Sequence, residues 1–333
     1  MLAILSCPGC ARKLRVPDNK RGTVTCPLCG SEWFHLEVEA PLDQDSARTA
    51  LDELFTLAGK YNSSDAYLEL MQFVGRFRFY SPFNAMLIYT QMPGAHFVCT
   101  ARRWRKDYHR EIKISARPIV VLQPMGPILF VFDVGDTAPL PNAPPLPRQV
   151  VDPFHVRDGK IGGQLARTIE NAKRDGVRVT ERADGSQWAG SIQWASAGQH
   201  QEFTISKKSP PKSTLIPVSF ELLLNSIHSA EAKYGTIVHE LAHLYCGHLG
   251  TPNDRWWPDR RNLSHAVREF EAESVSYLVC TRLGIDTASD EYLAAYVRKS
   301  SVTPPINLDR VLKSAWLLEQ MGRASLGLRK PTT

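Results

Sequence analysis

The sequence lacks an apolar run of the about 20 residues that a membrane-spanning helix needs, so we expect no segment that crosses a membrane. We also expect no export signal, because the opening stretch MLAILSC is too short for the apolar core of a signal peptide. No internal repeat or low-complexity tail is present. We therefore expect a cytoplasmic protein, in a compartment that keeps cysteines reduced.

A large excess of one charge is also missing. The chain has 40 Lys and Arg residues against 34 Asp and Glu residues, which gives a net charge of +6. A surplus this small only weakly favours an anionic partner, so the positions of the cations matter more than their sum. The 333 residues are enough for two or three modest domains, each with a core of its own.

Four of the seven cysteines form two pairs near the N-terminus, CPGC and CPLC, with fifteen residues between them. This spacing is typical of a four-cysteine zinc site, which has no open position for a substrate. Redox-active pairs are the alternative, but they need a helix N-terminus beside one pair, and the pattern indicates none. We therefore expect a structural zinc ion in a unit that resembles a zinc ribbon, over residues 1–36. The expected ligands are Cys7, Cys10, Cys26 and Cys29.

The rest of the chain mixes helical and strand-like patterns, which predicts an α+β protein. Helical periodicity covers residues 47–61, 81–92, 162–176 and 266–284, and also 220–248 in one or two pieces. β-Branched and aromatic residues predict strands at 113–116, 118–124, 128–134 and 201–208. A proline-rich segment between them predicts an extended linker. The expected order is an α+β domain over 44–136, a linker over 137–153 and a second domain over 154–325.

One predicted helix contains TIVHELAHLYCGHLG, and its His-Glu-x-x-His string is typical of a catalytic zinc site. Residues advance about 100° around a helix, so His239 and His243 lie about 40° apart and one turn from each other. Two imidazoles can then bind one ion, while Glu240 lies beside them as a base for a bound water. A chance string on an exposed helix is the alternative, but apolar neighbours such as Ile237 and Leu241 favour a buried helix.

The same stretch holds two further residues that could bind a metal. His248 is nine residues from His239, about 180° around the helix, and reaches the metal only if the helix ends before it. Gly247 offers such an end, and a supporting or capping role is the preferred interpretation of His248. Cys246 lies one turn beyond His243, where a small buried residue is the simpler interpretation. The metzincin pattern is excluded, because it wants Gly at position 246 and His at position 249.

A catalytic zinc ion needs a third protein ligand and an open position. In REFEAESVSYLVC, Glu269 and Glu273 are four residues apart and share a helix face, whereas Glu271 is rotated by about 200° and should face elsewhere. A solvated acidic face is the alternative, which the apolar residues that follow disfavour. The arrangement resembles that of gluzincins, in which one glutamate binds the metal and a residue one turn later orients a ligating histidine. That resemblance implies Glu269 as the ligand and Glu273 as the orienting residue.

Together the two helices resemble those of the ImmA/IrrE-type zinc metallopeptidases, particularly the form associated with ArdC-like antirestriction proteins. That family has a His-Glu-x-x-His helix, often with a histidine five residues later, and then Glu-x-Glu-Ala on a second helix. The resemblance covers roughly residues 160–320 and implies a zincin-like peptidase domain with one catalytic zinc ion. The matching residues are His239, Glu240, His243 and Glu269, with His248 as the extra histidine.

The first α+β domain resembles the N-terminal domain of ArdC-type proteins, which is associated with binding single-stranded DNA. The matching features are YSP followed by Asn84, LIYTQ, and ARPIVVLQP leading to VFDVGDT, whereas HREIKI departs from the commoner Gly-Arg-x-Val pattern. Cations beside aromatic rings suit a single strand, because phosphates meet the charges and bases stack on the rings. A solvated basic surface over a core tryptophan is the alternative. The candidate residues are Arg102, Arg103, Trp104, Arg105, Lys106 and Arg110.

The sequence therefore predicts a zinc-dependent metallopeptidase that hydrolyses one specific, regulatory protein and carries a DNA-binding module. Zinc and Glu240 would activate water, and residues 202–206 are a candidate edge strand for pairing with the substrate. Tyr245, His265 and Tyr277 are open candidates for the oxyanion donor. The alternative function is a DNA- or protein-binding antirestriction or regulatory protein that keeps the zincin fold as a scaffold or sensor.

Overall fold

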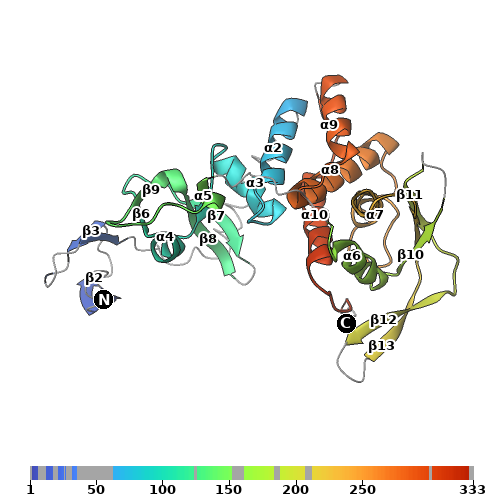
Figure 1. Ribbon diagram of the computed structural model, residues 1–333, viewed down its shortest axis with the longest axis horizontal. Helices are drawn as coiled ribbons and strands as arrows, with labels where there is room; N and C mark the ends of the chain where they lie inside the picture. Colours follow the sequence, from blue (N-terminus) through green and yellow to red (C-terminus); the bar gives the residue numbers. More distant parts are fainter. Residues whose placement is uncertain are drawn as a thin grey trace. The chain divides into compact units, whose positions relative to one another are not determined.

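The computed structural model describes most of the chain, and its helices and strands are mixed along it, as predicted for an α+β protein (Figure 1). They fall into two compact units, one of Met1–Thr56 and Val98–Pro145, the other of Leu57–Phe97 and Leu146–Thr333. Among the described helices, none combines the length and the apolar composition needed to cross a membrane. The described residues are 2–6, 13–17, 22–25, 27, 32–35, 63–123, 126–151, 161–183, 188–206, 212–299 and 302–329.

The first unit begins with two antiparallel hairpins. β1 (Leu2–Ser6) pairs with β2 (Lys13–Pro17), and β3 (Gly22–Thr25) pairs with β4 (Glu32–His35). The predicted zinc ligands and the predicted helix over 47–61 lie outside the described residues, so the zinc ribbon stays a prediction. The ligands concerned are Cys7, Cys10, Cys26 and Cys29.

The remainder of the first unit is built around one short helix, α4 (Ala101–Tyr108). β8 is the middle strand of the sheet β5-β8-β7, and β6 pairs with β9. The predicted strands at 118–124 and 128–134 correspond to β7 and β8. The strand predicted at 113–116 is wrong: the strand in this region is β6, which ends before it, at Ile112. The strands are β5 (Val98–Cys99), β6 (Arg110–Ile112), β7 (Ile119–Gln123), β8 (Gly126–Asp133) and β9 (Thr137–Pro139), with the 3-10 turn η1 (Val134–Asp136) before β9.

The second unit combines helices with a three-stranded mixed sheet and a separate hairpin. In the sheet, β14 lies between β10, to which it is parallel, and β11, to which it is antiparallel. The hairpin consists of β12 and β13. The strands are β10 (Val177–Arg182), β11 (Gly190–Trp194), β12 (His200–Ser206), β13 (Lys212–Pro217) and β14 (Phe220–Asn225). The helices are α2 (Ser64–Arg76), α3 (Pro82–Gln91), α5 (Arg148–Val151), α6 (Gln164–Lys173), α7 (Ala230–Tyr245), α8 (His265–Leu283), α9 (Ala288–Lys299) and α10 (Leu308–Arg323).

The predicted helix over 220–248 is two elements in the structure. Its first six residues form β14, and the helix α7 starts only at Ala230. Phe220, Leu222 and Leu224 are completely buried, so this leucine-rich stretch alternates with the period of a strand. Burial in the sheet between two strands outweighs the helix propensity of leucine here.

The structure also divides the chain differently from the domain boundaries expected from the sequence. Residues 63–97, which the sequence groups with the strands that follow them, pack in the second unit: α2 contacts α8, and α3 contacts α10. Buried Tyr67 on α2 donates a hydrogen bond to Ser274 on α8, at 2.8 Å. The chain therefore leaves the second unit and returns to the first at Val98, well before the proline-rich segment.

Arg282 on α8 is a second polar link between these helices. Its side chain is buried, forms an ion pair with Glu319 on α10 and donates to the backbone oxygens of Val74 and Phe77, at 2.8 and 2.9 Å. One guanidinium group thus satisfies carbonyls at the C-terminal end of α2 and a buried carboxylate at the same time.

Replacing Arg282 with Met should lower the free energy of unfolding by about 3–5 kcal/mol, because Glu319 would lose its main buried partner. Arg323→Met is the matched control, since Arg323 also faces Glu319, at 3.5 Å, but is partly exposed. The control should cost less than about 1 kcal/mol. Urea unfolding followed by circular dichroism measures both variants, and equal losses would contradict the assigned role of Arg282.

Candidate metal centre

The helix α7 is held at both ends by local signals in the sequence. The Ser229 side chain accepts a hydrogen bond from the backbone N–H of Ala232, and Glu231 adds a negative charge in the first turn. The helix stops at Cys246, because Gly247 adopts a left-handed conformation with φ of 86°. A Cβ atom at Gly247 would lie 2.1 Å from the backbone oxygen of Pro258, so only glycine fits this turn.

The helix α8 packs against α7 and is capped in the same way. Ser264 accepts from the N–H of Val267 at the start, and Gly284, with φ of 78°, ends the helix where the sequence predicts a stop. Figure 1 shows α8 beside α7, with β11 also next to α7, in agreement with their contacts. This packing brings the predicted ligands on the two helices together.

The metal donors predicted from the sequence converge. The Nε2 atoms of His239 and His243 are 3.2 Å apart, and the Glu269 carboxylate oxygens lie 3.7 and 3.5 Å from them. In tetrahedral zinc sites the ligand atoms lie about 2.0–2.2 Å from the ion, which places them roughly 3.3–3.5 Å from one another. The three observed separations lie within about 0.2 Å of that range, the two to Glu269 being to different carboxylate oxygens, so this donor set fits a zinc ion in composition and approximately in spacing.

The two histidines have opposite electrostatic environments. Burial is the largest influence on His243 and, together with the charges of His239 and His248, lowers its pKa to about 2. Burial also acts to lower the pKa of His239, but the hydrogen bond and charge of Glu273 outweigh it and raise that pKa. The Nδ1 atom of His239 lies 3.5 Å from Glu273. Glu273 therefore lies where the sequence predicts it, behind a candidate ligand.

Glu240 lies on the same helix as the two histidines and is partly buried. Burial and the neighbouring Glu269 charge raise its pKa, although the charge of His239 and a hydrogen bond from the backbone N–H of Ile192 act against that shift. Ile192 belongs to β11, so this carboxylate faces the edge strand of the sheet. A carboxylate with a raised pKa beside a metal site is suited to exchanging a proton with water.

As predicted, Glu271 does not share the helix face of Glu269, and it has hydrogen-bond partners of its own. It is completely buried and accepts hydrogen bonds from His248, Arg260 and the backbone N–H of Asn307. His248 in turn contacts His243, with 3.0 Å between their Nδ1 atoms. The predicted supporting role of His248 thus has a specific partner that helical rotation alone did not indicate.

Cys246, His248 and Glu271 also bring potential metal ligands within 4.8 Å of one another. However, Glu271 and Cys246 already have other hydrogen-bond partners. Arg260 and Asn307 use both oxygens of Glu271, and the Cys246 thiol is directed to Ser314 at 3.5 Å. Burial raises the pKa of Cys246 to about 12, which disfavours a thiolate ligand. This buried cluster is a polar network rather than a second metal site.

The candidates for an oxyanion donor differ in how far their side chains are buried. Tyr245 is buried and donates to Asp175 at 2.8 Å, and Tyr277 is buried as well, so neither borders the metal donors from an open side. His265 has a side chain that is 79% exposed, with Nδ1 3.4 Å from Glu269. The sequence did not single out Tyr292 on α9, whose pKa is raised by burial and then by the charges of Glu269 and Glu273. No motif in the sequence marks Tyr292, because α9 meets the site only through folding.

The residues predicted to bind nucleic acid do not form a stacking surface. Trp104 is completely buried, and its indole N–H donates to the backbone oxygen of Phe132 at 2.8 Å. Arg110 donates to Thr137, while Arg103 and Arg105 form ion pairs with Asp107 and Glu111 at 3.1 and 3.2 Å. Arg102 and Lys106 are exposed and make no ion pair with another described residue. The core tryptophan confirms the alternative that the sequence left open for this residue.

Comparison with known proteins gives little further information. No protein-family profile and no curated protein matches the chain. The metal-free crystal structure of the antirestriction protein ArdC from plasmid R388 is similar over 73% of this chain and 85% of that chain, with 14% sequence identity and a TM-score of 0.33. Similarity of this size establishes neither a shared fold nor a shared function.

Replacing Glu269 with Ala should lower the affinity for zinc at this site at least about 100-fold, because one of three ligands is removed. Glu231→Ala on the first turn of α7 is the control and should keep full affinity. Metal analysis after dialysis, together with competition against a zinc chelator, measures the change. Retention of tight zinc binding by the Glu269 variant would show that the carboxylate is not a ligand.

Proposed function

We propose that this protein is a zinc-dependent metallopeptidase, with His239, His243 and Glu269 as zinc ligands. The observation that carries the proposal is the convergence of these three donors beside Glu240, at separations suited to one tetrahedral ion. Three protein ligands leave a position open for water or substrate, as in catalytic zinc sites and unlike closed structural ones. A zincin-like fold of the second unit is part of the same proposal.

The chemistry divides between the metal and the protein. Bound zinc would supply a Lewis acid that lowers the pKa of a water molecule and polarises a carbonyl. Glu240 would accept a proton from the attacking water and later donate it to the leaving amine, for which its raised pKa is suited. Glu273 contacts the Nδ1 atom of His239 and so orients its ring. The candidates for stabilising the developing oxyanion are His265, whose Nδ1 lies 3.4 Å from Glu269, and Tyr292, whose pKa the charge of Glu269 helps to raise.

The strand β11 offers a place for the substrate backbone. It is an edge strand, since β14 is its one partner among the described strands, and its Ile192 N–H reaches Glu240. An extended peptide can add to such an edge by β-augmentation. The sequence pointed to residues 202–206 for this role, but they lie in β12, which pairs with β13 in a separate hairpin.

The proposed substrate is one specific protein, a regulator, rather than protein in general. This part of the proposal follows from the expected cytoplasmic location, where unrestricted proteolysis would damage the cell. The alternative remains a DNA- or protein-binding antirestriction or regulatory protein that uses the same fold as a scaffold or sensor. The presence of Glu240 beside the donors favours the peptidase, because a scaffold has no need of a base there.

Replacing Glu240 with Gln should leave zinc affinity nearly unchanged and lower peptide hydrolysis about 100- to 10,000-fold, because the amide cannot accept the proton of water. The measurement compares the proteins of cells that produce the wild type with those of cells that produce the variant, by mass spectrometry of new N-termini. Glu231→Gln on the same helix is the control. Equal fragment patterns from wild type and Glu240→Gln would contradict the peptidase and favour the scaffold.

Binding of single-stranded DNA by the first unit is a second candidate function. The exposed cations Arg102 and Lys106 on α4 favour it, because charges that are free of ion pairs with the described residues can meet phosphates. Stacking on Trp104 is not part of this proposal, since that ring lies in the core.

Replacing Arg102 and Lys106 with Glu should lower the affinity for a fluorescent single strand and reduce its salt dependence by about one unit of logarithmic slope per lost phosphate contact. The same change at Arg298 and Lys299, exposed on α9 in the second unit, is the matched control. Fluorescence anisotropy over a series of salt concentrations provides the measurement. Binding that is insensitive to salt would contradict this second function.

A further inference from the structure

The segment that follows α10 contacts a buried carboxylate, that of Asp175, two residues beyond the end of α6. The side chain of Asp175 is 0% exposed. Arg329 forms a bidentate pair with it, in which Nε donates to one carboxylate oxygen and Nη2 donates to the other, the second bond at 3.0 Å. The Tyr245 hydroxyl at the end of α7 donates to the same carboxylate, at 2.8 Å. The pair is geometrically specific, because the planar fork of a guanidinium matches a carboxylate.

Two tryptophans complete this contact. The Cζ atom of Arg329 lies 5.3 Å from the ring centroids of both Trp256 and Trp257, within the range of a cation–π interaction. Trp257 is buried, and its indole N–H donates to the backbone oxygen of Gly250 at 2.8 Å, which fixes the ring. We call Asp175 and the two tryptophans the Asp175 site. Its chemistry selects an arginine side chain, because a guanidinium pairs with the carboxylate and stacks on the rings.

The stretch that carries Arg329 has few other attachments among the described residues. Asn171 on α6 accepts a hydrogen bond from the backbone N–H of Leu326, at 2.8 Å, and so holds the start of the segment. Beyond that point, the Arg174 side chain donates to the backbone oxygen of Gly327 at 3.3 Å. The residues Gly327–Arg329 therefore depend mainly on the arginine itself for their position.

The Asp175 carboxylate needs the charge that Arg329 brings. Arg174 is the other cation beside it, but its Nε atom lies 3.5 Å from the carboxylate and makes no hydrogen bond with any described residue. A buried carboxylate that loses its best partner is costly and favours another cation. The site would therefore still favour a guanidinium after Arg329 had left it.

We propose that the Asp175 site binds arginine side chains, and that Arg329 is a releasable latch in it, which an arginine of another protein can replace. The weak hold on Gly327–Arg329 allows the latch to open, and the buried carboxylate favours a new occupant. Selection rests on the bidentate pair and the two rings rather than on a long contact surface. Neither a metal ion nor peptidase activity is needed for this exchange.

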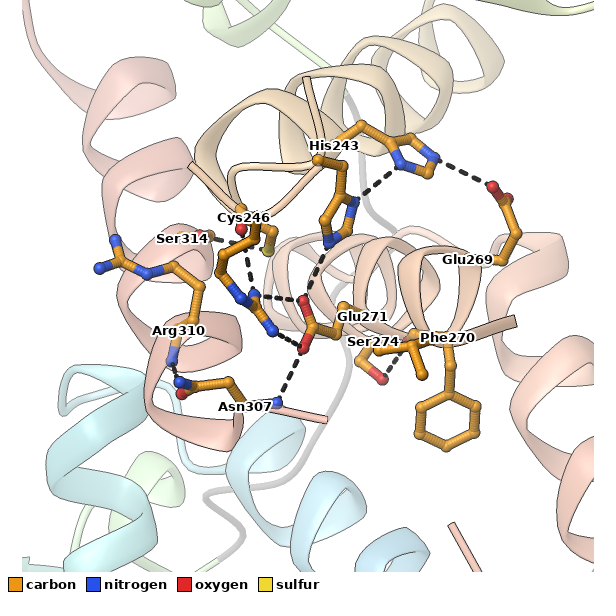
Figure 2. A network of polar contacts seen from close by, with 12 residues as sticks. His243, Cys246, Glu269, Phe270, Glu271, Ser274, Asn307, Arg310 and Ser314 are labelled. Atoms are coloured by element: carbon orange, nitrogen blue, oxygen red, sulfur yellow. Dashed lines mark hydrogen bonds and ion pairs between the residues drawn. The ribbon is translucent and has the colours of Figure 1, made fainter. Parts of the chain in front are cut away.

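The latch also acts on the loop between α7 and α8, to which both tryptophans belong. Three residues after Trp257, Arg260 donates to both oxygens of Glu271, in the polar network shown in Figure 2. Arg260 also donates to the backbone oxygen of Cys246 at the end of α7, at 3.0 Å. The loop is therefore attached at one place by the latch and at another by the network behind the candidate metal donors. Opening the latch loosens the first attachment.

The first test empties the site and refills it with a small molecule. Arg329→Ala in the full-length chain should lower the melting temperature by at least about 5 °C, because a buried carboxylate loses its bidentate partner. Millimolar methylguanidinium should then raise the melting temperature of this variant but not that of the wild type, whose site is filled. Methylammonium has the same charge without the planar fork, so it should not have this effect.

Arg323→Ala is the matched control for this test. Arg323 also lies over a tryptophan, with Cζ 6.0 Å from the ring centroid of Trp316, but it is partly exposed. Methylguanidinium should not stabilise the control variant. Equal effects of the two small cations on Arg329→Ala, or equal effects of methylguanidinium on both variants, would overturn the proposed site.

The second test asks whether an arginine from outside the chain can enter the site. The probe is a fluorescent Gly-Leu-Arg amide, which has the sequence of residues 327–329, and anisotropy measures its binding. Its Kd should be at least about 10-fold lower for Arg329→Ala than for the wild type, whose attached arginine competes at a high effective concentration. A probe with lysine in place of arginine should bind at least about 10-fold more weakly. Equal binding of both probes would contradict recognition of arginine.

Hydrogen exchange reports whether the latch holds the loop. The backbone N–H of Trp256 donates to the backbone oxygen of Asn253 at 2.9 Å, so it is protected while the loop is in place. It should exchange faster in Arg329→Ala than in the wild type, and more slowly again when the arginine probe is added. Equal exchange in the variant and the wild type would show that Arg329 is not a latch. A folded Arg329→Ala protein that binds neither methylguanidinium nor the probe would refute the binding site.

Discussion

The packing of α7 against α8 is the contact on which the rest of the second unit depends. On one side the contact brings together three candidate metal donors, and on its buried side it places the Glu271 carboxylate in the core. A buried carboxylate is costly unless charge and hydrogen bonds compensate for it. Arg260, His248 and the backbone of Asn307 provide that compensation, so the same helix pair that forms the site also determines which side chains must lie behind it.

Two arginines stabilise this helix pair in different places. Arg260 links the end of α7 to Glu271 on α8, while Arg282 links the other end of α8 to α2 and α10. Each satisfies a carboxylate and at least one backbone carbonyl together, for which a planar guanidinium with five donors is better suited than an ammonium with three. The consequence is a site on rigid helices, and rigid support is what precise ligand geometry requires.

The same reasoning from residue types gave opposite results in the two units. The two histidines at helical spacing came together as expected, because their geometry is set within one turn of one helix. Cations around Trp104 did not form a stacking surface, because an aromatic ring is at least as useful in the core as at a surface. Local spacing is a strong guide where the chemistry is local, and composition is a weak one where burial decides.

The sequence by itself determined the helical end at Gly284 and the common face of the first two candidate ligands, since a glycine stop and helical rotation act within a few residues. Only the tertiary structure decided that the leucine-rich start of the predicted helix is a strand of a mixed sheet, and that α2 and α3 belong to the second unit. It alone also placed His248 beneath His243 and Glu271 beneath His248. Those contacts join parts of the chain that a turn at one glycine and the packing of two helices bring together, and no periodicity in the sequence encodes them.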